Sequence, residues 1–241
     1  SADWVKVLAN ENDAEVIGEE FIPLSESGFS STINRIQEAD PDFVMSMLVG
    51  NNHTAFYEQK ASAGLDVPIG TSTAMAQGYE HRRLDPPAMA NIYAGVNYME
   101  EVPTARNTDE GGFVDRYYEM YPDAPYLNEE AETNYFSTYM YKQAVEQAGT
   151  FEQEEVKAAL ESGISYPAPE APEGEEISLV PETHHVDHHM WVMKSDEEHN
   201  VTAVDDRVIP ETFLKDTVGC DLTAEDEETQ YTPQDYYEEA G

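Results

Sequence analysis

The sequence predicts an α/β protein with a parallel sheet and helices on both faces of that sheet. Between residues 15 and 73, short apolar segments of strand length alternate with segments whose apolar residues recur at helical spacing. Strands that are separated by helices pair in parallel, because each helix returns the chain to the same end of the sheet. A chain of 241 residues is long enough to bury a sizeable core in such a fold.

The first half of the chain consists of these repeats. Trp4, Val5 and Leu8 lie on one helical face, so we expect the chain to open with a helix. A strand is expected at residues 15–24, where an apolar run ends at a proline turn. Further strands are expected at residues 43–49, 67–73 and 91–98, and helices at residues 29–38, 54–63 and from residue 74 onwards.

The second half is mainly helical. After a linker at residues 103–112, helices are expected at residues 113–121, 129–149 and 151–162, and strands at residues 177–180, 189–193 and 201–204. Residues 166–174 form a proline-rich acidic loop that we expect not to pack, and the acidic tail from Cys220 onwards is expected to be extended. The expected core stripe of the long helix consists of Tyr135, Tyr139, Ala144, Val145 and Ala148.

Charge is the second strong feature of the sequence. The chain has 50 Asp and Glu residues against 12 Lys and Arg residues, which gives a formal net charge of -38. Such a surface repels itself, and concentrated salt screens that repulsion. We therefore interpret the composition as an adaptation to molar salt. We expect no nucleic-acid binding, because the sequence has no basic patch that could neutralise phosphates.

The sequence lacks several features, and their absence excludes further classes of protein. No apolar run reaches the length of about eighteen residues that a membrane span needs. The single cysteine, Cys220, excludes an intrachain disulfide. Residues 1–8 do not have the pattern of a signal peptide. Because a parallel sheet that opens on a helix has lost its first strand, we expect this chain to be the C-terminal portion of a longer protein.

The likeness to a known family rests on an ordered set of segments rather than on one motif: residues 16–24, 29–36, 41–44, 48–50, 55–57, 63–65, 97–98, 132–135, 142–149 and 181–185. Together these segments resemble the second half of the urea and short-chain amide receptors of ABC transporters. Those receptors belong to the type I periplasmic-binding-protein family, which also includes branched-chain amino-acid receptors.

The resemblance implies a two-lobed, non-enzymatic receptor that closes around a small polar solute and delivers it to the permease of an ABC importer. Residues 1–102 would form lobe two, residues 103–200 the crossover with the helices and returning strands of an incomplete lobe one, and residues 201–241 an acidic extension. The implied location is extracellular, with membrane attachment only through an N-terminal anchor that this sequence lacks. No cofactor is implied.

Candidate ligand-binding residues follow the expected strands, because ligands of open parallel sheets sit beyond the carboxyl ends of the strands. Gly50 and Asn51, with Asn52, follow one strand, and Thr71, Ser72 and Thr73 end the next. Their amide and hydroxyl groups suit a polar solute, although Asn, Ser and Thr also cap helices. The resemblance adds Tyr98 as a cleft wall or a packing residue, and Glu132 and Tyr135 on a helix near the cleft.

A histidine-rich segment is the basis of the main alternative. His184, His185, His188 and His189 flank Asp187, so zinc or nickel binding is conceivable. Alternate residues of a strand point to opposite faces, however, so few of these groups can converge on one ion, and we expect a surface turn without metal. Four functions therefore stay open: a urea or amide receptor (for uptake or as an intracellular sensor), a branched-chain amino-acid receptor, a metal-dependent hydrolase, and a truncated remnant that binds nothing.

Overall fold

The computed structural model describes residues 2–104, 112–210, 212–218, 221 and 223. Most of the linker expected at residues 103–112 and most of the tail expected from Cys220 onwards lie outside these residues. Two compact units are present: unit 1 contains residues 1–95 and 194–201, and unit 2 contains residues 96–193 and 202–224.

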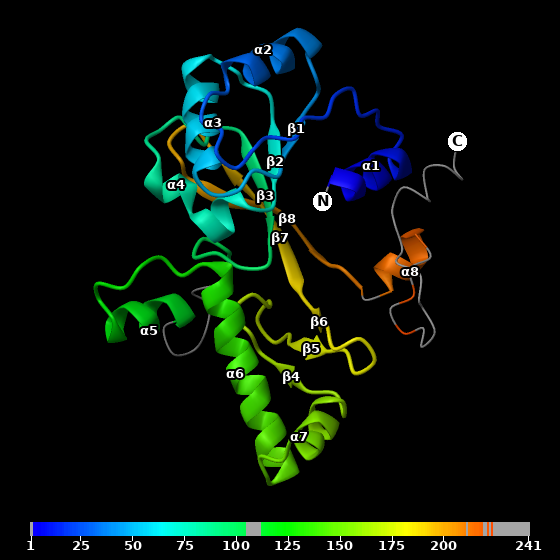
Figure 1. Cartoon of the computed structure of the whole chain (residues 1–241). Helices are drawn as coiled ribbons and strands as arrows, with labels where there is room; N and C mark the ends of the chain where they lie inside the picture. Colours follow the sequence, from blue (N-terminus) through cyan, green and yellow to red (C-terminus); the bar gives the residue numbers. More distant parts are fainter. Residues whose placement is uncertain (1, 105–111, 211, 219–220, 222, 224–241) are drawn as a thin grey trace. The chain divides into compact units, whose positions relative to one another are not determined.

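Unit 1 contains the strand–helix repeats that the sequence predicts. In chain order its elements are α1 (Ala2–Glu11), α2 (Ser30–Ala39), β1 (Val44–Ser46), α3 (Asn51–Ser62), β2 (Ile69–Thr71), the π-helix η1 (Ala74–Gly78), α4 (Glu80–Arg83) and β3 (Ile92–Val96). Strands β1, β2 and β3 pair in parallel, with Val44 opposite Ile69 and Ile69 opposite Ile92. In Figure 1, α3 and α4 lie on one side of these strands and α1 lies on the other, which confirms the predicted α/β layering.

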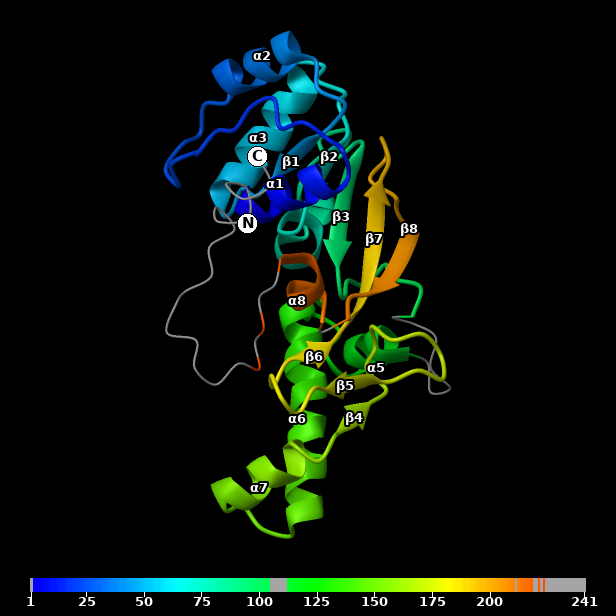
Figure 2. The same cartoon turned by 90° about the vertical axis from the view of Figure 1, so that its right-hand side faces the viewer.

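The sheet continues beyond β3 in the order β1-β2-β3-β7-β8. Strands β7 (His189–Ser195) and β8 (Val201–Val208) are neighbours in this sheet, and they lie side by side in Figure 2. Residues of β7 alternate between buried and half-buried, as expected for a strand with two different faces.

The strand predicted at residues 15–24 is wrong. This segment has no strand partner, and Phe21 and Leu24 are 81% and 75% exposed. Its acidic side chains are bound by neighbouring helices instead: Glu19 pairs with Lys6 of α1, and Glu20 pairs with Arg35 of α2. The apolar pattern indicated a strand, but the segment joins no sheet and its glutamates contact α1 and α2 instead.

Packing in unit 1 joins α2 and α3. The Phe29 and Phe56 rings lie 5.4 Å apart, edge to face, and Phe56 also contacts the buried Tyr57. Edge-to-face aromatic pairs stabilise a core by about 0.5–1.5 kcal/mol beyond the area that they bury. This contact fixes the N-terminal half of α3, which follows directly from the carboxyl end of β1.

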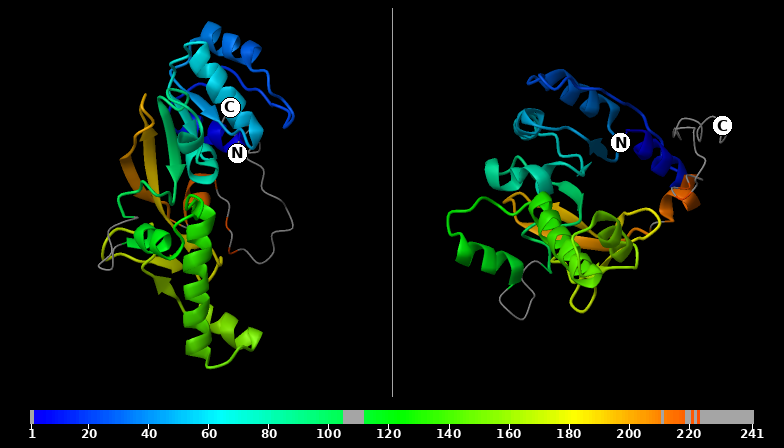
Figure 3. Two further views of the ribbon diagram at one scale, coloured as in Figure 1. Left: turned by 90° about the vertical axis from the view of Figure 1, so that its left-hand side faces the viewer. Right: turned by 60° about the horizontal axis from the view of Figure 1, so that its bottom comes forward.

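Unit 2 is built around one long helix. Its elements are α5 (Gly112–Met120), α6 (Glu129–Ala148), α7 (Gln153–Leu160), the antiparallel strands β4 (Ser165–Tyr166), β5 (Ile177–Leu179) and β6 (Val186–Asp187), and α8 (Phe213–Val218). The Asn128 side chain caps α6 by accepting a hydrogen bond from the Ala131 N–H at 3.1 Å. Gly149 ends the helix in the left-handed conformation, with a φ of 68°. Figure 3 shows α7 folded back beside the C-terminal half of α6.

One expectation about this unit is wrong in part and another is wrong. In the expected stripe of α6, Ala144 is buried and Val145 and Ala148 pack against the core, but the other buried residues are Glu132, Phe136 and Met140, whereas Tyr139 is 39% exposed. The loop at residues 166–174 does pack: Ala168 and Ala171 join the core formed with Phe136 and Ile177. The small alanines between the prolines allow the loop backbone to lie close to α6. Glu170, between these alanines, is fully buried as well.

Candidate functional site

The carboxyl ends of β1 and β2 bring the predicted residues of unit 1 together. The Thr73 hydroxyl donates to the Leu48 carbonyl at 2.8 Å, and so joins the segment after β2 to the segment after β1. The Thr73 N–H donates to the Thr71 hydroxyl at 3.1 Å, and the two hydroxyls lie 3.2 Å apart. Because the Thr73 proton points to Leu48, Thr71 is the donor within this pair. Both threonine hydroxyls are thus used inside the protein.

Ser72 differs from its neighbours. It is exposed, and its hydroxyl has only a weak contact of 3.4 Å with the Met47 sulfur. A thioether is a poor acceptor, so a solute oxygen or nitrogen can replace it easily. Of the three predicted hydroxyls, that of Ser72 is the one presented to solvent.

Gly50 and Asn51 lie on the other side of this site, and we call residues 47–52 and 71–73 together the rim. Gly50 begins α3 with a φ of 65°, which a residue with a side chain rarely adopts, and Asn51 is exposed. The N–H groups of Asn51 and Asn52 have no partner within the helix and no side-chain cap, whereas the His53 N–H donates to the Gly50 carbonyl at 3.2 Å. The rim therefore offers N–H, amide and hydroxyl groups, and its segments 47–52 and 71–73 contain no charged residue.

Asn52 has a structural position rather than an exposed one. It is 1% exposed, and its side-chain amide donates to the Pro23 carbonyl at 2.9 Å. It thereby anchors the irregular segment that precedes α2.

His53 and Glu80 lie behind the rim, and the sequence analysis did not identify either of them. The Nδ1 atom of His53 is 3.3 Å from Glu80 Oε1, and its Nε2 atom is 3.2 Å from the Thr73 hydroxyl. A carboxylate, an imidazole and a hydroxyl in this order also form hydrolytic triads. Here, however, Nε2 also contacts the Leu48 carbonyl, which can only accept, so Nε2 carries a hydrogen and cannot take the proton of Thr73. The arrangement holds Thr73 in place and does not activate it.

The predicted residues of unit 2 form a separate group. Tyr98 is fully buried, and its ring is 5.9 Å from Phe113, which in turn lies 4.6 Å from Tyr135. Tyr135 continues the row to Tyr139 and Tyr166, at 4.9 and 6.3 Å. Packing accounts for the positions of Tyr98 and Tyr135 without any ligand.

Glu132 is fully buried on α6, and its carboxyl oxygens have no side-chain hydrogen-bond partner among the described residues, although the backbone of Glu170 lies close to them. Burial, reinforced by the charge of Glu170, raises the pKa of Glu132 to about 9. The side chain is therefore a neutral carboxylic acid at pH 7.

The histidine-rich segment is divided among three carboxylates. His184 pairs with Glu161 at 2.8 Å, His188 with Glu170 at 2.8 Å and His189 with Asp206 at 3.0 Å, whereas the backbone N–H of His185 donates to Thr183. In the part of the chain that the structure describes, no three His, Cys, Asp or Glu residues are placed to hold a metal ion.

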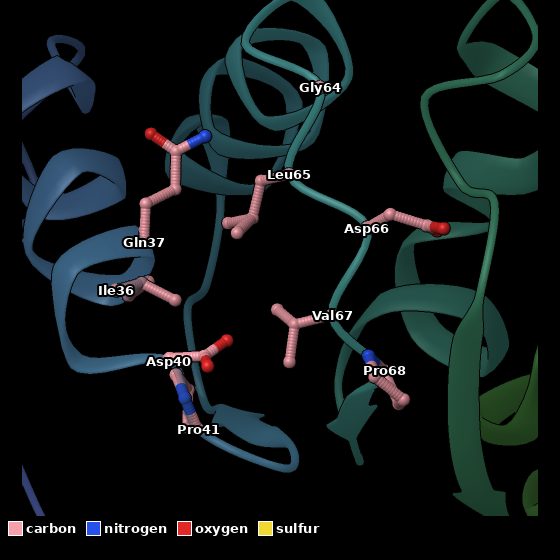
Figure 4. A pocket seen from close by; sticks show the side chains of 9 residues that line it. All are labelled: Ile36, Gln37, Asp40, Pro41, Gly64, Leu65, Asp66, Val67 and Pro68. Carbon is pink, nitrogen blue, oxygen red and sulfur yellow. The ribbon is translucent and has the colours of Figure 1, made fainter.

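A cavity of about 400 Å³ lies at the other end of the strands from the rim. Pro41 and Pro68, which precede β1 and β2, are among its lining residues. Figure 4 shows the Ile36, Leu65 and Val67 side chains pointing toward one another across it. Its position at the amino ends of β1 and β2 separates it from the candidate site.

Comparisons with known proteins agree with this fold. A family model described as periplasmic binding protein matches residues 1–200. Similar solved structures include an ABC-transporter solute-binding protein from R. palustris in complex with benzoate (18% identity, 88% of this chain and 55% of that chain covered, TM-score 0.68). Another is the leucine-, isoleucine-, valine-, threonine- and alanine-binding protein of Brucella ovis in a closed conformation (16% identity, 86% and 54% covered, TM-score 0.72).

These likenesses confirm the predicted fold, that of a type I periplasmic binding protein. The chain spans little more than half the length of the two solved proteins. A search of curated proteins gives no match. Among the described residues, no helix has the length and apolar character needed to cross a membrane.

Proposed function

This chain belongs to the family of periplasmic binding proteins, and we propose that it is the solute-binding part of an ABC importer. In this proposal the rim of unit 1 binds a small polar solute outside the cell, closure secures it, and permease subunits receive it. A ligand drives such closure only through its higher affinity for the closed form. The proposal includes no enzymatic activity, no cofactor and no nucleic-acid partner.

The observation that carries the proposal is the uncapped start of α3 beside Ser72. The backbone N–H groups of Asn51 and Asn52, the Asn51 side-chain amide and the Ser72 hydroxyl are hydrogen-bond donors without a strong partner among the described residues. The helix dipole strengthens the N–H groups as donors to an oxygen atom. We infer that the rim binds the oxygen of a carbonyl group, with Gly50 allowing close approach and Thr71 and Thr73 fixing the loop from behind.

Urea or a short-chain amide is the solute that we propose first. The rim contains no charged residue, so it suits a neutral carbonyl compound better than a carboxylate in a chain of formal net charge -38. The ordered resemblance of the sequence to urea and amide receptors supports the same choice. Tyr98, Glu132 and Tyr135 of unit 2 stay proposed ligand-binding residues on the resemblance alone.

A branched-chain amino acid is the second candidate. The Brucella ovis protein is described as binding leucine, isoleucine and valine, and its TM-score to this chain is 0.72. Zwitterionic amino acids also present oxygen atoms that the start of α3 can bind.

Calorimetric titration in concentrated KCl distinguishes the two. We expect heat of binding for urea or acetamide and none for leucine, valine or benzoate. Binding of leucine and valine alone would replace the amide proposal with the second candidate. Absence of binding for every solute would contradict a receptor function for this chain.

A further inference from the structure

Glu170 accepts hydrogen bonds through both its side-chain carboxylate and its backbone carbonyl. Its carboxylate accepts from Asn97 Nδ2 at 3.0 Å, from His188 Nδ1 at 2.8 Å and from the His189 N–H at 3.2 Å. Its carbonyl accepts from Trp191 Nε1 at 3.1 Å and from the Thr104 hydroxyl at 3.3 Å. Glu170 is fully buried, and hydrogen bonds to a buried charge are about twice as strong as neutral ones.

The partners of Glu170 come from two particular segments. The chain passes between the two units at residues 95–96, 193–194 and 201–202. Asn97 and Thr104 belong to the segment that follows the first passage, and residues 188–191 belong to the segment that precedes the second. All of these residues lie in unit 2, so Glu170 joins both connecting segments within one body.

The charges around Glu170 explain how it can be buried. Glu132 beside it is neutral at pH 7, because burial raises its pKa to about 9. Burial lowers the pKa of His188, but the contacts with Glu170, together with the charges of Glu129 and Asp187, raise it above its ordinary value overall. The contact with Glu170 therefore favours the charged form of His188, while Glu132 keeps its proton. The Phe136 ring of α6 packs edge-on against His188 at 5.8 Å and limits its access to water.

We propose that Glu170 is a positioning residue for solute-driven closure, because it holds residues 97–104 and 188–191 together as a rigid base for the connections to unit 1. The inference rests on the proposed function. Replacing a buried ion pair with apolar groups often leaves stability unchanged, so stability alone does not explain such a group. Fixing the two connecting segments confines bending to the residues at the passages, as hinge motion requires.

The test compares Glu170→Gln with Glu173→Gln, an exposed position in the same loop. In Glu170→Gln, amides of residues 97–104 and 188–191 should exchange hydrogen roughly 10- to 150-fold faster, the factor expected for lost hydrogen bonds to a charged group. Exchange in the core around Met140 and Ala144 should not change. The NMR-measured pKa of His188 should fall, and solute affinity should weaken by roughly 2- to 30-fold. Glu173→Gln should match the unmodified protein in all of these measurements.

Asn97→Ala provides a second variant that keeps Glu170. It should accelerate exchange in residues 97–104 but not in residues 188–191, and this test applies even if Glu170→Gln does not fold. Equal exchange, His188 titration and affinity in Glu170→Gln and Glu173→Gln would overturn the inference. A different result is faster exchange in Glu170→Gln combined with no solute binding by the unmodified protein. This result would contradict the proposed function, and it would also overturn the inference, because the rigid base would have no role in closure.

Discussion

Glu132 and Glu170 place two carboxyl groups in the interior of unit 2, and among the described residues side-chain donors are bonded to Glu170 but not to Glu132. Glu132 avoids a second buried charge by keeping its proton. The pair therefore connects the stability of unit 2 to pH in a direction opposite to that of most surface carboxylates.

Glu132→Gln should remove that dependence. Between the ordinary pKa of 4.5 and the folded value of about 9, the folded protein holds a proton that the unfolded chain releases, so stability falls as pH rises. The slope should reach about 1.4 kcal/mol per pH unit for one proton. Thermal unfolding without denaturant, measured from pH 5 to pH 9, checks this slope, with Glu130→Gln on the same helix as the control. An unchanged slope in Glu132→Gln would show that Glu132 ionises normally.

His199 should have the opposite effect in unit 1. Its Nε2 accepts the Met89 N–H at 2.9 Å, so this nitrogen must be unprotonated, and Nδ1 faces the His81 carbonyl at 3.2 Å. Burial is the main cause that lowers the pKa of His199 below 6.5, although Asp196 and Asp85 oppose it. Stability from this contact is complete above pH 6.5 and falls as the unfolded chain binds the proton below that pH.

His199→Gln removes the titrating group. Its melting temperature should respond less to acidification from pH 7 to pH 5, and the loss of the hydrogen bond should lower stability by about 1 kcal/mol at pH 7. His185→Gln, at an exposed position, is the matched control. If both variants follow the unmodified protein across this range, the hydrogen bond to Met89 has no influence on stability.

Ser72→Ala and Thr73→Ala should affect solute binding in different ways. Ser72→Ala removes a donor whose internal contact is a weak one with the Met47 sulfur, so it should weaken affinity with unchanged stability. Thr73→Ala breaks the bond to Leu48 and should lower stability by about 1 kcal/mol as well. Calorimetry and thermal melts on the same samples separate the two effects. If Ser72→Ala binds the solute as tightly as the unmodified protein does, the solute does not bind at Ser72.

Salt should stabilise the whole chain. With a formal net charge of -38, repulsion between carboxylates opposes folding, and raising KCl from ~0.1 M to ~1 M shortens the screening length from about 10 Å to about 3 Å. The melting temperature should rise steeply over this range and much less with an uncharged osmolyte. A melting temperature independent of KCl would contradict the interpretation of the composition as salt adaptation.

The fold was predictable where local pattern and packing agree. The periodic apolar residues of α2 predicted that helix to within one position, because packing buries Ile33 on the same face, and α3 was predicted to within three positions. The prediction of a strand at residues 15–24 was wrong. Lys6 and Arg35 bind the glutamates of this segment, and because they lie on other elements, a local pattern does not show these contacts. In the N-terminal half of α6 the choice of Tyr139 over Met140 shifted the stripe by one residue, because tyrosine and methionine both suit a half-buried helix face, whereas Ala144 was predicted correctly.

The candidate site was predictable only in its position. The carboxyl ends of β1 and β2 indicated Gly50, Asn51 and Ser72, but no local signal distinguished Ser72 from the internally bonded Thr71 and Thr73. The spacing of His53 and Tyr57 on one face of α3 was the available sign of a polar layer behind the rim. Glu170 had no such sign, because its partners lie 18 to 73 positions away in the sequence.

The central claim is that a small neutral carbonyl compound binds at the rim of unit 1. Its most direct test is an NMR titration of the ¹⁵N-labelled protein with acetamide in concentrated KCl, because amide shifts report weak binding residue by residue. We predict saturable shifts at Asn51, Asn52 and Ser72, with none at Ile36, Leu65 and Val67 around the separate cavity. Saturable shifts at the cavity alone, or no saturable shift at the rim, would contradict the account.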